Sequence, residues 1–118
     1  MRNCYPSTIE FQRIQYGHPK YVALSTDAII GVVSNYYDIT INKMQSKSRE
    51  QPIARARMIA MYFIYKCIRN ASLKSIGKLF NRDHTTVIHA KNTVHDMTFG
   101  PDPVWRDEVL HFYELFNL

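Results

Sequence analysis

The fold of this chain is decided by residues 72–90, which read SLKSIGKLFNRDHTTVIHA. In the second half of this stretch, Asp83 can accept a backbone N–H as the N-cap of a helix. His84, Thr85 and Thr86 then occupy the first turn, and the two apolar residues that follow, 87 and 88, turn inward to pack. A polar first turn of this kind is the part that a recognition helix places against base edges.

The first half of the same stretch predicts a shorter helix. Ser72 can cap two turns in which apolar residues recur at positions 73, 76, 79 and 80. Only Asn81 and Arg82 separate this helix from the next, and Gly77 removes a side chain where the helices approach closely. A short capped helix, a tight break and a second capped helix indicate a helix-turn-helix at about residues 72–97.

The rest of the chain predicts further helices and no strand. We expect helices at about 25–37 and 40–44 and, after a polar loop over 45–51, a longest helix from Pro52 to about Arg69. A final helix follows Asp102 and Pro103. The apolar faces are expected to comprise Ile53, Ala56, Ala60, Phe63, Ile64 and Cys67 in the longest helix and Trp105, Val109, Phe112, Tyr113 and Phe116 in the last.

The fold class is therefore all-α, a small multi-helix domain with a long central helix and a helix-turn-helix. The chain has 118 residues, enough for one core, and we place the helical domain at residues 25–118. Residues 1–24 contain Pro6, Gly17 and Pro19 and show no sustained periodicity. We expect them to form an irregular N-terminal arm.

Positive charge is concentrated in one part of the sequence. Residues 43–95 carry eleven Lys or Arg against two acids, a balance of +9, whereas the remaining residues carry −4. A basic block that coincides with the helix-turn-helix favours a phosphate-binding face. The alternative is a solvated helical surface, but such surfaces usually mix charges of both signs.

Three segments, residues 54–62, 72–77 and 80–90, give the chain a resemblance to a known family. They are similar to the C-terminal DNA-binding domain of the bacterial replication initiator DnaA. The resemblance extends more loosely from Ser25 to Leu118, and residues 1–24 fall outside it. It implies the fold of that domain, which is like that of the Trp repressor, and double-stranded DNA as the partner.

The resemblance also implies which residues contact DNA. Asp83, His84 and Thr85 are the candidates for reading bases in the major groove. A carboxylate can accept from cytosine N4, an imidazole can donate to a purine, and a threonine methyl can contact the thymine methyl. For Asp83 the alternative is that it only caps its own helix. The candidates for contacts to the DNA backbone or groove are Arg49, Arg55, Arg57, Lys74, Lys78, Arg82, Thr86, His89 and Lys91.

The chain departs from the family's pattern in two places. In the loop before the long helix, Glu50 and Gln51 stand where relatives are more basic. The candidates for minor-groove contact are therefore Lys47, Arg49 and Gln51, with Arg49 favoured. In the turn, one residue is missing compared with many relatives. Asn81 tolerates the left-handed conformation that so tight a turn requires.

Several classes of protein are disfavoured by the sequence. The two cysteines form no disulfide framework, no segment is a signal or a membrane span, and no P-loop for a nucleotide is present. His84, His89 and His95 would rotate successive imidazoles by about 140° and 240°, so we expect no metal. We therefore predict a non-enzymatic protein without a cofactor, located in the cytoplasm of a bacterial or phage-infected cell.

The predicted function is sequence-specific binding of duplex DNA with a role in replication initiation or its regulation. The resemblance implies A/T-rich boxes of the TTATCCACA type as targets. Two alternatives stay open: a transcriptional regulator, and an interaction protein that mimics the initiator domain to bind the initiator or its regulators. The start at Met1 and the aromatic arm favour a natural short protein over an excised fragment, although both remain open.

Overall fold

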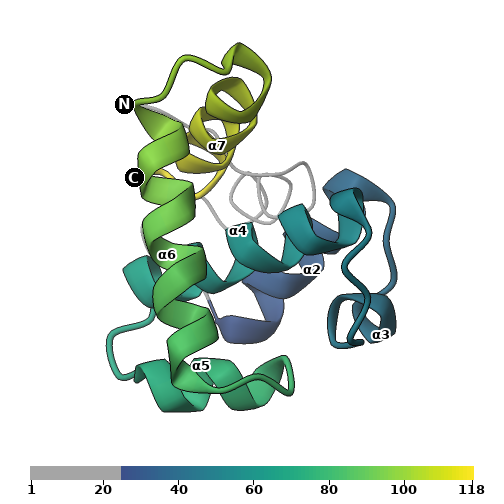
Figure 1. The fold of residues 1–118 in the computed structure, drawn as a ribbon. Coiled ribbons are helices and arrows are strands. Elements are labelled where there is room, and N and C mark those ends of the chain that lie inside the picture. The colour runs from purple at the N-terminus through teal and green to yellow at the C-terminus, as the bar shows by residue number, and fades with distance from the viewer. Residues whose placement is uncertain (1–24) are drawn as a thin grey trace, which may run out of the picture. The chain divides into compact units, whose positions relative to one another are not determined.

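The computed structural model describes residues 25–118, and the predicted arm over residues 1–24 lies outside the described residues. The described part consists of helices without a strand, which confirms the all-α prediction (Figure 1). Residues 25–96 form one compact unit and residues 97–118 belong to a second. The helices are α2 (Thr26–Tyr37), α3 (Ile41–Met44), α4 (Gln51–Cys67), α5 (Leu73–Leu79), α6 (His84–Thr98) and α7 (Pro103–Leu115).

Side-chain caps fix the beginnings of most of these helices. The Ser25 hydroxyl accepts from the amide of Ala28 at 3.1 Å, and the Thr40 hydroxyl accepts from the amide of Lys43 at 3.2 Å. These bonds satisfy amides that have no partner inside the helix, and they confirm the predicted starts of α2 and α3. α4 has Pro52 in its first turn as predicted. It ends at Cys67, two residues earlier than predicted, because the backbone of Ile68 is extended.

The core of residues 25–96 is built around α4, which packs against α2, α3 and α5. The expected stripe is confirmed, except that Cys67 is only half-buried. Ile59, Met61 and Tyr62 are buried as well, although they lie outside that stripe. α4 is therefore enclosed on most of its circumference, as a central scaffold must be. On α6, the side chains of Val87, Ala90 and Val94 are buried, whereas Ile88, which we expected to be buried, is half-buried.

Residues 97–118 contain α7. The carboxylate of Asp102 accepts from the amide of Val104 at 3.0 Å, which confirms the predicted start of this helix. Its apolar face is confirmed at Trp105, Val109, Phe112 and Phe116, all buried, while Tyr113 is half-buried. None of the described helices is both long and apolar enough to span a membrane.

Candidate nucleic-acid interface

The first helix of the predicted helix-turn-helix is fixed at both ends. Ser72 and Ser75 form a reciprocal capping box, in which each side chain accepts from the other residue's amide at 3.0 and 2.9 Å. At the other end Asn81 adopts a left-handed conformation, with φ of 58°. Its amide bonds to Lys78 O, and the amide of Arg82 bonds to Gly77 O at 2.8 Å. This is a Schellman motif, and it confirms the role that the sequence suggested for Asn81.

Gly77 allows the turn to fold back onto α5. A Cβ atom at this position would lie 2.5 Å from the carbonyl oxygen of Arg82 and 3.1 Å from that of Asp83. The close approach predicted from the sequence is therefore to the backbone just before α6. Glycine permits it because it has no Cβ.

Asp83 caps α6. Its Oδ1 accepts three hydrogen bonds, from the amide of Thr86 at 3.1 Å, the hydroxyl of Thr85 at 2.7 Å and the hydroxyl of Thr86 at 3.1 Å. These bonds, of which the one from Thr85 contributes most, lower the pKa of the Asp83 carboxyl. The capping role is confirmed, and contact of Asp83 with a base stays a prediction.

This geometry predicts how Asp83 titrates. Because its pKa is depressed in the folded chain, its contribution to stability is complete above the ordinary carboxyl value of about 3.9 and is lost as the pH falls through the lower folded value. Thr85→Val removes the largest cause and should raise the Asp83 pKa, which an NMR titration of the carboxyl carbon would detect. A Thr85→Val protein whose Asp83 titrates as in the original chain would show that the Thr85 bond does not form.

The polar side chains beside this cap are accessible. His84, Thr85 and His89 are exposed on α6, Lys74 and Lys78 are exposed on α5, and Thr86 and Lys91 are half-buried. His84 and Lys74 line a groove of about 450 Å³ together with Ser72 and Leu73. The first turn of α6 and the start of α5 thus line one groove that carries Lys74 and His84.

Arg57 has a role that the sequence did not predict. It is only 5% exposed, and its guanidinium donates to Met44 O at 2.7 Å, Ser46 O at 2.9 Å and Ser48 O at 3.0 Å. Burial, and secondarily the charge of Arg82, lower the pKa of Arg57. Since these donors serve the loop before α4, we leave Arg57 out of the phosphate-binding residues proposed below.

The same loop is tied to the turn of the helix-turn-helix. Arg82 Nη2 donates to Ser46 O at 2.9 Å, Gln45 Nε2 donates to Leu79 O at 2.8 Å, and Asn81 Nδ2 donates to Gln45 O at 3.2 Å. These bonds connect residues that are 34 to 36 positions apart. The loop and the start of α6 are therefore held in one arrangement.

Besides the buried Arg57, four of the predicted DNA-contacting residues meet where this loop faces α6. Arg49, Arg82, Thr86 and His89 line a groove of about 410 Å³, whose floor includes Met58 and Met61 of α4. Lys47 and Gln51 are exposed and Arg55 is half-buried, but none of the three lines this groove. Of the three minor-groove candidates in the loop, Arg49 is the one that lines this groove, and its contact with DNA stays a prediction.

A capped two-turn helix, a Schellman turn and a longer helix with a polar first turn define a helix-turn-helix DNA-binding domain. A family model described as "Bacterial dnaA protein helix-turn-helix" matches residues 26–94. The chain belongs to this family. Its membership agrees with the resemblance found in the sequence.

Curated relatives match the same region. The chain is 46% identical over 72 residues to the chromosomal replication initiator protein DnaA of Chlorobaculum tepidum. The matched stretch covers 60% of this chain and 14% of the relative. The chain is 41% identical over 85 residues to the DnaA protein of Laribacter hongkongensis, covering 71% of the chain and 18% of the relative. The identity to the DnaA protein of Streptococcus mutans is 37% over 91 residues, a stretch that covers 76% of the chain and 20% of the relative. The chain thus spans at most a fifth of the length of these relatives.

Proposed function

We propose that this chain binds duplex DNA in a sequence-specific manner through the first turn of α6. The observation that carries this proposal is the position of His84 and Thr85, which are exposed next to a fully formed cap, with His84 lining a groove together with Lys74. Exposed polar side chains at a helix start read bases, and the surrounding cations bind phosphates. Among residues 25–118, no acidic residue lines this groove or the groove of Arg49, Arg82, Thr86 and His89.

Each side chain has a chemical role in this proposal. The imidazole of His84 donates to a purine, and the methyl group of Thr85 contacts a thymine methyl. Because the Thr85 hydroxyl is bonded to Asp83, its rotamer is fixed before DNA arrives. The Asp83 carboxylate already accepts three hydrogen bonds at Oδ1, so it can accept from a base only through its remaining lone pairs. Phosphate contacts come from Lys74, Lys78, Arg82, Thr86, His89 and Lys91, with Arg55 near the start of α4.

The loop before α4 is proposed to approach the neighbouring minor groove. Arg57 and Arg82 both donate to Ser46 O, so the backbone on the N-terminal side of Arg49 is held in place. Arg49 itself is exposed and is the leading candidate, since a narrow A·T-rich minor groove attracts arginine. Lys47 and Gln51 are secondary candidates.

The relatives' name places their whole proteins at chromosome replication initiation. For this chain we propose a non-catalytic role in the same process or in its regulation, in the cytoplasm, with boxes of the TTATCCACA type as targets. An initiator or one of its regulators is then a candidate partner. Transcriptional regulation would use the same DNA-reading surface.

The proposal is tested by comparing two kinds of substitution on two duplexes. His84→Ala or Thr85→Ala should cost about 1–3 kcal/mol of binding free energy on a box-containing duplex and much less on a scrambled one, because only base contacts distinguish them. Lys78→Ala should weaken both alike. Fluorescence anisotropy titrations measure the affinity of the original chain and of the three variants for each duplex. Equal losses on both duplexes for all three variants would remove the base-reading assignment.

A further inference from the structure

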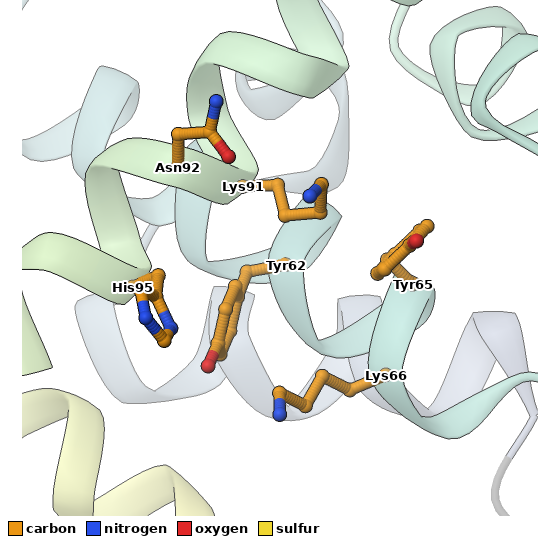
Figure 2. A pocket seen from close by; sticks show the side chains of 6 residues that line it. All are labelled: Tyr62, Tyr65, Lys66, Lys91, Asn92 and His95. Atoms are coloured by element: carbon orange, nitrogen blue, oxygen red, sulfur yellow. The ribbon is translucent and has the colours of Figure 1, made fainter.

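A third groove lies between α4 and α6, farther along α6 than His84 and His89 (Figure 2). It has a volume of about 250 Å³. α4 contributes two tyrosines and a lysine, and α6 contributes a lysine, an asparagine and a histidine. The lining residues are Tyr62, Tyr65, Lys66, Lys91, Asn92 and His95.

The two lysines of this groove lie over aromatic rings. Lys91 Nζ is 5.0 Å from the centre of the Tyr65 ring, and Lys66 Nζ is 5.7 Å from that of Tyr62. The quadrupole of a ring attracts a cation at these distances and restricts where its ammonium lies. None of the described residues that line it is acidic, and the Asn92 amide adds a further donor. Such a lining suits an anion.

The position of the groove along α6 relates it to DNA. With 3.6 residues per turn, Lys91 and His95 each fall within about 20° of the direction of His84, on the same face. Lys91 lies roughly 10 Å farther along the axis, at a rise of 1.5 Å per residue. The major groove is about 8.5 Å deep. A helix whose start contacts bases therefore carries Lys91 at about the level of the sugar–phosphate backbone.

The groove lined by Arg49, Arg82, Thr86 and His89 is on a different side of α6. Thr86 and His89 point about 140° to 200° away from His84 around the helix axis. Each wall of the major groove belongs to one DNA strand, so a helix between them needs a phosphate-binding surface on two sides. The groove of Arg49 supplies one, and the groove of Lys91 is placed to supply the other.

We infer that the groove between α4 and α6 binds backbone phosphates of the duplex, on the strand opposite to that held by the Arg49 groove. The inference rests on the proposed function, since it assumes that the start of α6 contacts bases. Lys91 was expected from the sequence to bind phosphate. Lys66 and Asn92 are added as phosphate donors, and Tyr65 is a positioning residue that holds the Lys91 ammonium.

The charge of Lys91 is tested first. Lys91→Gln should weaken binding severalfold on box-containing and scrambled duplexes alike, and should reduce the slope of log K against log salt by about 0.9, the value for one lost phosphate contact. The control is Lys43→Gln, which removes the same charge from α3, away from all three grooves. If the two variants lose the same affinity and slope, the inference is overturned.

The role of Tyr65 is tested by a double-mutant cycle. Tyr65→Leu should weaken binding in the original chain and have no effect in the Lys91→Gln background, whereas Tyr65→Phe keeps the ring and should bind as the original chain does. Additive effects of Tyr65→Leu and Lys91→Gln would overturn the positioning role. Because Tyr65 is 43% exposed, these changes should leave folding intact.

Failure of this inference is distinguishable from failure of the proposed function. A chain that does not prefer the box, but loses affinity and salt slope with Lys91→Gln and not with Lys43→Gln, would keep the phosphate site and lose sequence-specific reading. A chain that prefers the box while Lys91→Gln behaves as Lys43→Gln does would keep base reading and lose this phosphate site.

Discussion

Gly77→Ala should destabilise the protein by about 2–3 kcal/mol, the upper part of the range for overpacking. The added methyl would lie 2.5 Å from the carbonyl oxygen of Arg82, so the turn before α6 must shift. The better helix propensity of alanine stabilises α5 by only about 1 kcal/mol, and the expected net destabilisation takes this gain into account. Urea denaturation measures the change. The same shift should displace α6 and lower DNA affinity.

Gly31→Ala is the matched control, because it makes the same chemical change in the interior of α2. A Cβ there meets no atom of the described residues within 4 Å. Gly31→Ala should therefore stabilise the protein by about 0.5–1 kcal/mol through helix propensity alone. If both substitutions stabilise, the turn does not approach α5 as closely as the structure shows.

Arg57→Met should cost about 2–4 kcal/mol of unfolding free energy, because it removes charged hydrogen bonds to three carbonyls, among them the buried bond to Met44 O. Methionine keeps most of the side-chain length, so the loss reports on the guanidinium. Chemical denaturation monitored by circular dichroism measures it.

Arg49→Met is the comparison that separates stability from binding. Arg49 is exposed, so this change should leave stability within about 0.5 kcal/mol while it lowers affinity for DNA. The opposite result, in which Arg49→Met unfolds the protein and Arg57→Met affects only binding, would reverse the roles assigned to the two arginines.

Local sequence signals predicted much of the fold. Ser25, Thr40, Ser72, Asp83 and Asp102 each cap the helix expected of them, because a cap is a contact between residues two or three positions apart. The left-handed Asn81 was likewise a local inference. The early end of α4 was not predicted, since the apolar pattern continues through Ile68 while the backbone there turns extended.

The structural role of Arg57 could not be predicted from its positive charge. In a basic segment every arginine is a candidate for phosphate, and only tertiary packing decides which one is buried. One signal was present: Arg57 lies four residues after Ile53 and three before Ala60, both on the predicted buried stripe. The bonds between the loop and the turn span more than thirty residues, so no local pattern could reveal them.

The central claim, sequence-specific binding through α6, is tested most directly by titrating the full chain against a duplex that contains the TTATCCACA box and against its scramble. Both titrations are made at low and at near-physiological salt. We expect the box to be preferred by about 10³-fold or more, with a preference that persists as salt rises. Equal binding to both duplexes that disappears with salt would contradict the claim, because it would show phosphate contacts without base reading.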